Sequence, residues 1–301
     1  MQYIPHEYQK YATEKIIELP ACALFMEMGL GKTVSTLTAI NELIYDRFEV
    51  QKVLVIAPYR VADDTWTTEA DKWDHLKHLR VSKVLGTSGE RIAALEADAD
   101  IYVINRENVT WLVNLTGKEW PFEMIVVDEL SSFKSNSAKR FKSLRIVRPL
   151  ARRFVGLTGT PAPNGLLDLW PQVYLIDRGE RLGKTYTGYK DRYFLPDRRN
   201  GFVVYSWTPK EGAKEAIEQK LSDICISMKA DDYLNLPAQI VNDVYVSMDR
   251  HEMRKYRELE KEKLLELDGK EITALSAAAV WGKLLQLANG AAYDLSLIHI
   301  S

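Results

Sequence analysis

The sequence contains few cysteines, no long apolar run and no excess of charge of either sign. Only two of its 301 residues are cysteine, Cys22 and Cys225, which excludes a disulfide framework and offers no metal-ligand spacing. A chain so poor in cysteine is typical of a reducing compartment, and we expect the cytoplasm. The apolar runs are far shorter than the roughly 20 residues of a membrane helix, so we expect no membrane partner.

Three further properties narrow the class of protein. The N-terminal string MQYIPHEYQK has no basic stretch followed by an apolar one, so no signal peptide is expected. The 40 Lys and Arg residues balance 42 Asp and Glu, and the net charge of −2 does not by itself indicate a nucleic-acid partner. With 46% hydrophobic and 27% charged residues, the composition is globular and excludes disordered, collagen-like and coiled-coil chains. The length favours two domains.

Five short apolar runs alternate with segments of helical periodicity over the first two thirds of the chain. The runs are continuous rather than alternating, as in parallel strands that are buried on both faces. They lie at 22–25, 53–57, 101–104, 124–127 and 154–157. Because helices connect such strands, the sequence predicts βαβ units and an α/β fold with a doubly wound, mostly parallel sheet over residues 1 to about 230.

The pattern changes in the last third of the chain. Residues 179–205 are rich in Gly, Arg, Tyr and Asp and show no clear period. Thr208, Pro209 and Glu211 are the residue types of a helix N-terminus, which predicts a helix from there to about Ile224. Further elements are expected: a connection at 235–238, a strand over 240–248, an exposed helix over 250–267 and a more apolar helix over 272–288.

The string Gly29-Leu30-Gly31-Lys32-Thr33 follows the first apolar run and opens an amphipathic segment, which is the context of a phosphate-binding loop. Glycines let successive backbone N–H groups face an anion, and the helix N-terminus adds partial positive charge. We expect Lys32 to reach the β- and γ-phosphates of a nucleotide and the Thr33 hydroxyl to ligate Mg²⁺. The strict eight-residue P-loop pattern is not met, so a simple helix start is the alternative.

Two carboxylates, Asp128 and Glu129, end the apolar run at 124–127. The carboxyl end of a parallel strand is where such sheets bind ligands. We expect Asp128 to hold Mg²⁺, directly or through water, and Glu129 to orient or deprotonate an attacking water. An acidic turn after a strand is an equally good interpretation of these residues alone, and the earlier P-loop favours the catalytic one.

A third string, Thr158-Gly159-Thr160, follows the last of the five apolar runs. Its two hydroxyls at a strand end are expected to hydrogen-bond the region of Asp128 and Glu129. The alternative is an ordinary Thr/Gly/Pro turn.

Eight basic residues and no acidic one lie between positions 134 and 153. Such a block indicates a phosphate-facing patch, and a solvated helix face with basic residues near its C-terminus is the alternative. The eight are Lys134, Lys139, Arg140, Lys142, Arg145, Arg148, Arg152 and Arg153.

These motifs, in this order, resemble those of superfamily 2 helicases and, more narrowly, of the SNF2-like ATP-dependent DNA translocases of compact phage and bacterial type. Four strings carry the resemblance: EMGLGKT (27–33), LVIAPYR (54–60), DELSSFK (128–134) and LTGTPAPNGLLDLW (157–170). The resemblance covers residues 1 to about 290. It implies an enzyme that hydrolyses ATP with Mg²⁺ to move on duplex or single-stranded DNA, favoured as a monomer in a bacterial or phage-infected cytoplasm.

The resemblance also implies the domain organisation. Residues 1–235 correspond to a RecA-like ATP-binding lobe with an irregular and helical insertion at about 179–225. Residues 236–301 correspond to the start of a truncated second RecA-like lobe.

The resemblance assigns roles to further residues. Gln9, with Tyr8 beside it, matches the motif that reads the adenine base. Pro58 and Arg60 fall in motif Ia, which touches the DNA backbone in the family. Gly29, Gly31, Lys32 and Thr33 match motif I. Asp128 and Glu129 match motif II, and Lys134 matches the lysine that extends motif II. Thr158, Gly159 and Thr160 match motif III, which couples the ATP and DNA sites.

The sequence departs from the family pattern in several places. Met26 replaces the usual Asp before the Glu of motif I, and Ser131 stands where His is usual in motif II. The Ser131 hydroxyl leads us to expect altered coupling rather than lost ATP binding. The late motifs and their arginine finger have no counterpart, and residues 295–301 stop resembling the family.

Two alternatives to the translocase follow. The first is an ATP- and DNA-binding fragment with negligible turnover, because its partner lobe is incomplete. The second, an unrelated P-loop kinase or GTPase, is disfavoured because the guanine-reading N-K-x-D string does not occur.

Overall fold

The computed structural model describes residues 1–162, 165–197, 199–200, 203–228, 247–262, 264–267, 270–273 and 277–289. The chain divides into two compact units, Met1–Leu236 and Pro237–Ser301. Among the described residues, no helix combines the length and the apolar character that crossing a membrane requires.

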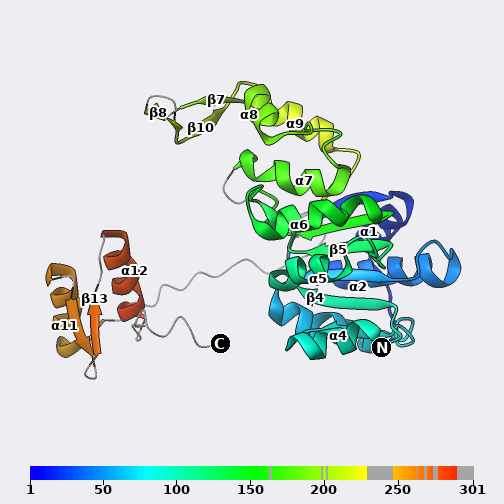
Figure 1. Ribbon diagram of the computed structural model, residues 1–301, viewed down its shortest axis with the longest axis horizontal. Helices are drawn as coiled ribbons and strands as arrows, with labels where there is room; N and C mark the ends of the chain where they lie inside the picture. The colour runs from blue at the N-terminus through cyan, green and yellow to red at the C-terminus, as the bar shows by residue number, and fades with distance from the viewer. Residues whose placement is uncertain are drawn as a thin grey trace. The chain divides into compact units, whose positions relative to one another are not determined.

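A seven-stranded sheet forms the centre of the first unit, with the strand order β11-β1-β6-β5-β2-β4-β3. Figure 1 labels β4 and β5 of this sheet. Every pair of neighbouring strands is parallel. The strands are β1 (Ala21–Met26), β2 (Val53–Ala57), β3 (Val81–Val84), β4 (Ile101–Asn105), β5 (Met124–Asp128), β6 (Arg153–Thr158) and β11 (Cys225–Met228). The α/β fold and the five strands expected from continuous apolar runs are confirmed.

Nine helices are described in the first unit: α1 (Glu7–Glu18), α2 (Lys32–Asn41), α3 (Trp66–Lys72), α4 (Ser88–Glu96), α5 (Val109–Thr116), α6 (Lys139–Val147), α7 (Leu169–Asp177), α8 (Tyr186–Tyr193) and α9 (Ala213–Leu221). Short turns supplement them: the π-helical η1 (Glu42–Asp46) and η2 (Val61–Thr65), and the 3-10 helices η3 (Arg106–Asn108), η4 (Leu130–Phe133), η5 (Arg148–Leu150) and η6 (Leu166–Asp168).

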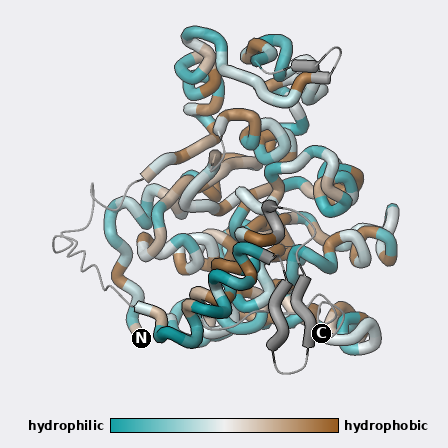
Figure 2. The backbone as a smooth tube through the Cα atoms, turned by 90° about the vertical axis from the view of Figure 1, so that its left-hand side faces the viewer, coloured by the Kyte–Doolittle hydropathy of each residue, from teal (hydrophilic) through white to brown (hydrophobic). Residues whose placement is uncertain are grey.

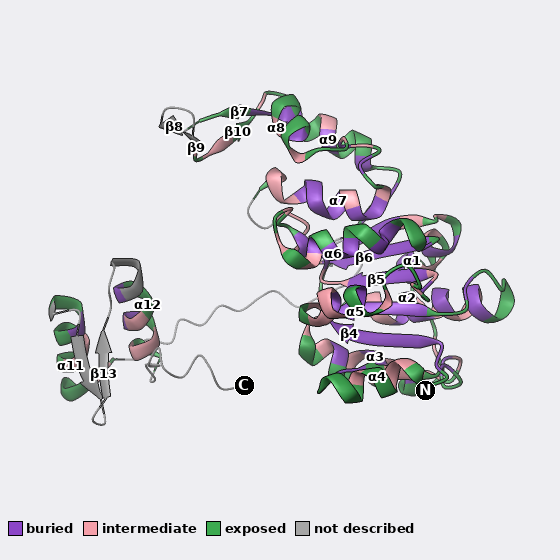
Figure 3. Ribbon diagram, in the orientation of Figure 1, coloured by how far each residue is buried: buried purple, intermediate pink, exposed green. Residues whose placement is uncertain are grey.

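Successive strand residues point to opposite faces of the sheet, so two hydrophobic cores form, one on each face. One core packs Leu24 and Val55 of the strands against α1, α2 and α3. The other packs Ala23 and Leu54 against α5, α6 and α7. The five inner strands of the sheet are accordingly buried along most of their length, as Figure 3 shows for β4, β5 and β6.

The helix start expected at Thr208 is wrong. Residues Trp207–Pro209 form strand β10, which pairs antiparallel with β7 (Phe194–Pro196). Helix α9 begins only at Ala213, after Gly212 adopts a left-handed conformation with φ of 70°. Pairing with a strand that is distant in sequence outweighs a local capping pattern here.

Order also appears where no period was evident in the sequence. Helix α8 buries Tyr189 and Tyr193, and Tyr189 packs edge-on against Phe194 with ring centroids 5.4 Å apart. Aromatic burial on one side stabilises this short helix without a regular apolar repeat. A further hairpin pairs β8 (Arg199–Asn200) with β9 (Val203–Val204).

The second unit contains α11 (Arg250–Glu262), β12 (Leu264–Leu267), β13 (Lys270–Thr273) and α12 (Ala277–Ala288). Helix α11 is strongly hydrophilic (Figure 2), and its Leu259 packs with Val280 and Leu284 of α12. Both expected helices are shorter than predicted, because the antiparallel pair β12–β13 lies between them. The connection at 235–238, most of the strand at 240–248 and the segment 295–301 lie outside the described residues.

Candidate nucleotide-binding site

The loop between β1 and α2 has the backbone of a phosphate-binding turn. Gly29 and Gly31 adopt left-handed conformations with φ of 86° and 78°. A Cβ at Gly31 would overlap the side-chain amide of Gln9, so only glycine fits there. Gly31 is also the N-cap of α2, and it has no side chain with which to cap the first N–H groups of the helix. These N–H groups remain suited to an anion.

Lys32 holds its ammonium group inside this loop. Its Nζ donates hydrogen bonds to the carbonyl oxygens of Met26 at 2.7 Å and Glu27 at 3.3 Å. Burial lowers the pKa of Lys32, while the charges of Asp128 and Glu129 oppose that shift. The positive charge therefore lies between the loop and the two carboxylates at the end of β5, those of Asp128 and Glu129.

Asp128 ends β5, between strands β6 and β2. Its Oδ2 accepts a hydrogen bond of 3.1 Å from Nε1 of Trp66. Burial raises the pKa of Asp128, and the Trp66 bond and the Lys32 charge act against that rise. The neighbouring Glu129 has a φ of 58°, a left-handed conformation that is uncommon for a residue other than glycine and concentrates at functional sites.

Thr158 joins strand β6 to this acidic pair. Its hydroxyl donates a hydrogen bond of 2.9 Å to Oε1 of Glu129, and the Ser131 hydroxyl donates to the same oxygen. The expected contact between the Thr158 hydroxyl and the acidic pair is confirmed. Thr160 takes part through its backbone N–H, which donates to the Thr158 hydroxyl at 3.2 Å.

Gly159 brings the third motif next to the first. A Cβ built on Gly159 would lie 3.5 Å from the carbonyl oxygen of Met26 at the end of β1. Strands β1 and β6 are direct neighbours in the sheet. The three motifs therefore meet at one edge of the sheet.

The side chain of Gln9 is hydrogen-bonded to the P-loop. Its Nε2 donates to the Leu30 carbonyl at 3.3 Å, and its Oε1 accepts from the His6 backbone N–H at 3.0 Å. The Tyr3 hydroxyl donates to the same oxygen at 3.4 Å. Gln9 is 8% exposed, so its amide is held in one orientation.

A cavity of about 450 Å³ opens beside Gln9 and the P-loop. Gly29, Gly31, Lys32 and Thr33 form one wall, and the aromatic side chains of Tyr3, His6 and Trp73 contribute to the rest. This combination of stacking surfaces and a phosphate-binding turn suits a nucleotide.

Tyr8, expected beside Gln9 at the base, is placed in the core instead of the cavity wall. It is 6% exposed, and its ring stacks on His6 at a centroid distance of 5.3 Å. Successive residues of a helix start cannot all face one cavity, and α1 turns Tyr8 inward. Tyr3, His6 and Trp73 were not predicted from the sequence as part of this cavity. Tyr3 and His6 shortly precede Gln9, and that proximity was the available signal for these two.

Several residues expected to face DNA lie after the carboxyl ends of strands. Pro58 and the exposed Arg60 follow β2, and the exposed Lys134 follows η4, which itself follows β5. Lys139 and Lys142 of α6 are exposed. Arg140 is half-buried, and its Nη2 donates to the Ser132 carbonyl at 2.7 Å. Arg140 therefore stabilises η4 through this bond instead of only facing solvent.

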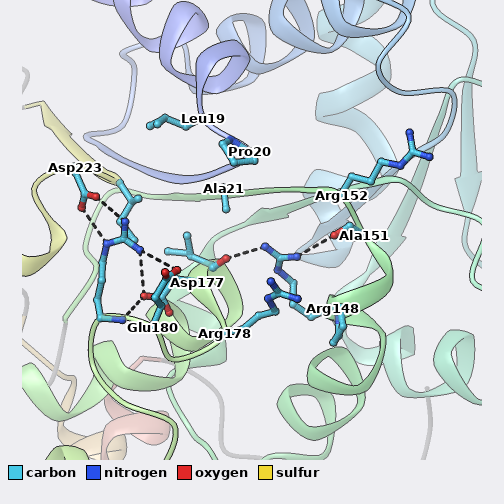
Figure 4. Close-up of a pocket in the computed structure, with 14 residues that line it drawn as sticks. Leu19, Pro20, Ala21, Arg148, Ala151, Arg152, Asp177, Arg178, Glu180 and Asp223 are labelled. Carbon is cyan, nitrogen blue, oxygen red and sulfur yellow. Dashed lines mark hydrogen bonds and ion pairs between the residues drawn. The ribbon is translucent and has the colours of Figure 1, made fainter.

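Two members of the basic block do not belong to a surface patch. The first, Arg148, is 5% exposed and donates to the carbonyl oxygens of Leu175, Ile176 and Ala151 at 2.5, 2.7 and 3.1 Å. Its burial lowers its pKa to about 10. Figure 4 shows the Arg148 guanidinium aimed at the Ala151 carbonyl on the wall of a second cavity of about 460 Å³.

This second cavity lies at the amino end of β1, at the opposite edge of the sheet from the P-loop. Arg153, the first residue of β6, is likewise buried and donates to the Ile16 and Ile17 carbonyls at the end of α1. Arginine donors satisfy helix C-terminal carbonyls that would otherwise be unpaired. Arg148 and Arg153 are therefore not part of an exposed patch, and the patch interpretation stays a prediction for the exposed members of the block.

Comparison with known proteins decides the family. Residues 8–290 match the model of the SNF2-related domain. The chain belongs to the SNF2-related family. It shares the RecA-like fold of a SWI2/SNF2 ATPase core from Sulfolobus solfataricus, solved in complex with dsDNA, with a TM-score of 0.64 and 22% identity. That match covers 96% of this chain and 58% of the other.

Two curated relatives illustrate the range of the family. The putative protein p41 of Acyrthosiphon pisum secondary endosymbiont phage 1 is 38% identical over 298 residues, 97% of this chain and 65% of the relative. The mouse DNA excision repair protein ERCC-6-like is 30% identical over 178 residues, 56% of this chain and 14% of the relative. The chain thus spans less than two thirds of the length of either relative.

Proposed function

We propose that this chain binds ATP with Mg²⁺ beside the P-loop and hydrolyses it to drive movement along DNA. The observation that carries the proposal is the convergence of Lys32, Asp128, Glu129 and Thr158 at one edge of the sheet, next to a cavity of nucleotide size. Lys32 and the first N–H groups of α2 would bind the phosphates, and Gln9 would face the base.

The donor groups fit a magnesium ion. A hydroxyl on Thr33 and a carboxylate on Asp128 are hard oxygen ligands, which Mg²⁺ prefers together with phosphate oxygens and water. When bound, the ion would neutralise charge on the phosphate oxygens. The Asp128 carboxylate accepts the Trp66 hydrogen bond, and the Lys32 ammonium lies near enough to interact with its charge. The protein therefore supplies a negative charge for the ion and a positive charge for the phosphates.

Glu129 is suited to hold the attacking water. Thr158 and Ser131 both donate to Oε1, which fixes the carboxylate and directs Oε2 away from these two hydroxyls. An oriented carboxylate oxygen can accept a proton from water within hydrogen-bond reach. The Ser131 side chain is small, and its hydroxyl reaches Oε1 of Glu129.

We further propose that the first unit is the ATP-binding lobe and that the second begins the partner lobe, in a protein that acts as a monomer in the cytoplasm. DNA would run over the surface formed by Pro58, Arg60, Lys134, Lys139 and Lys142. The dsDNA in the Sulfolobus structure and the DNA-repair name of the mouse relative support this partner.

The test measures nucleotide affinity by calorimetry and ATP turnover with and without duplex and single-stranded DNA. We expect Mg²⁺-dependent ATP binding and turnover that DNA accelerates. Absence of ATP binding would contradict the proposal. ATP and DNA binding without turnover would instead support the alternative of a binding module.

A further inference from the structure

Trp66 reaches the acidic pair from a distant part of the chain. It is the first residue of α3, it is fully buried, and 62 residues separate it from Asp128, to which its indole N–H donates. The π-helical turn η2 immediately precedes it, and such turns occur frequently near functional sites. Trp66 belongs to the core cluster that includes Leu30 of the P-loop and Val126 of β5.

Burial fixes both the ring and its bond. An indole N–H only donates, and in a buried position it requires an acceptor. The terminal torsion of an aspartate is broad, so a carboxylate rotates readily unless a partner holds one oxygen. Trp66 cannot swing away because its ring is enclosed, and Oδ2 of Asp128 therefore stays where the indole places it.

We propose that Trp66 is a positioning residue that orients the Asp128 carboxylate toward the Mg²⁺ of bound nucleotide, an inference that rests on the proposed function. The indole engages Oδ2, so Oδ1 would be the oxygen that meets the ion or one of its waters. A donor without lone pairs or charge orients the ligand and does not compete with it for the metal. Partners of this kind typically change metal affinity by about 10–100-fold.

A core-filling role for Trp66 predicts a different behaviour. Loss of packing alone would weaken folding and affect nucleotide binding equally with and without metal. Loss of carboxylate orientation would affect only the metal-dependent part of binding. The ratio of the two affinities therefore separates the roles.

The test compares Trp66→Phe with Trp170→Phe. Trp170 is also buried, at 2% exposure, and its indole donates to the Gly183 carbonyl at 3.0 Å, so the second variant loses an equivalent bond away from the site. Calorimetry measures ADP affinity in EDTA and across a Mg²⁺ titration, and electron paramagnetic resonance measures Mn²⁺ bound with ADP.

We expect the Mg²⁺ concentration for half-saturation to rise about 10-fold in Trp66→Phe, with metal-free ADP affinity within about twofold of wild type. Trp170→Phe should match wild type in both. A half-saturation unchanged in Trp66→Phe, or equal losses with and without metal, would overturn the inference. If the ADP affinity of the wild-type protein did not depend on Mg²⁺, the proposed function would be contradicted as well. This result distinguishes the two failures.

A measurement on the unsubstituted chain covers the case in which Trp66→Phe does not fold. The indole ¹H–¹⁵N resonance of Trp66, assigned by substitution of the other tryptophans, should move when Mg²⁺ is added to the ADP complex, while that of Trp170 stays. A Trp66 resonance that does not respond would overturn the inference.

Discussion

The hydroxyl of Thr158 donates a hydrogen bond of 2.9 Å to Oε1 of Glu129, and this bond links the end of β6 to the residue that follows β5. The backbone N–H of Thr160 donates in turn to the Thr158 hydroxyl at 3.2 Å. Any shift of the loop after β6 therefore moves a donor of the carboxylate that we assign to the attacking water. The bond gives a physical basis for the coupling role that the family resemblance implies for this motif.

Thr158→Val should preserve ATP affinity and slow hydrolysis. Loss of one orienting hydrogen bond to a charged group costs about 1.5–3 kcal/mol, or roughly 10–100-fold in rate. Single-turnover hydrolysis with protein in excess over ATP measures the effect. Thr116→Val, which removes a hydroxyl bonded within α5, is the matched control and should hydrolyse ATP like wild type. Equal rates in the two variants would show that the bond has no catalytic role.

Lys32→Ala should weaken ATP binding at least about 10-fold and leave the fold intact. The variant removes an ammonium group that burial has already partly desolvated, and charge-assisted bonds to phosphate are each worth about 1.5–3 kcal/mol. Calorimetry measures the affinity, and circular dichroism monitors the fold. Unchanged ATP affinity with a native spectrum would contradict the P-loop assignment.

Lys139→Glu combined with Lys142→Glu should weaken DNA binding for every sequence tested. Both side chains are exposed on α6, and each phosphate that the protein no longer neutralises reduces the salt slope by about 0.9 for duplex DNA. Fluorescence anisotropy across a salt series measures affinity and slope. Arg152→Glu, an exposed charge at the amino edge of the sheet, is the control. Arg152→Glu changes the net charge by −2, against −4 for the double variant, so an effect about half as large in Arg152→Glu would indicate a response to net charge rather than a patch.

Arg148→Met should destabilise the first unit by about 2–4 kcal/mol without a specific effect on DNA affinity. The guanidinium satisfies three carbonyl oxygens, two of them at the end of α7, and a thioether cannot replace those donors. Urea unfolding measures the loss. If the variant kept native stability but bound DNA more weakly, Arg148 would belong to the DNA-binding patch after all.

Asp100→Asn should destabilise the protein at neutral pH and have little effect at low pH. Burial alone would raise the pKa of Asp100, but the side-chain and backbone hydrogen bonds from Arg80 outweigh it and hold the pKa below its usual range. A lowered folded-state pKa contributes stability above the unfolded value of about 3.9, and this stability is lost as the pH falls through the folded value.

The loss at pH 7 should be about 1–2 kcal/mol, a figure reduced because Arg80 is half-exposed. Urea unfolding of both proteins between pH 3 and pH 7 measures it. A difference between wild type and variant that stays constant over this range would contradict the ionic contribution.

The sequence by itself determined the strands at the centre of the sheet and the turn at Gly29–Lys32. Continuous apolar runs can only be buried on both faces, and a glycine-rich turn between strand and helix has few backbone solutions. Asp128 and Glu129 lie at the carboxyl end of one parallel strand, and the P-loop follows the carboxyl end of another. The sequence therefore also placed both carboxylates near the P-loop. These features depend on neighbours in the chain, so a local pattern contains the information.

Only the tertiary structure decided the partners of isolated side chains. The bond from Trp66 to Asp128 spans 62 residues, and Arg148 and Arg153 reach carbonyl groups on other helices. Likewise, strand β10 replaced a helix start at Thr208 because β7 offered it a pairing edge. A residue's type limits which bonds it can make, but packing of distant elements determines which acceptor lies within reach.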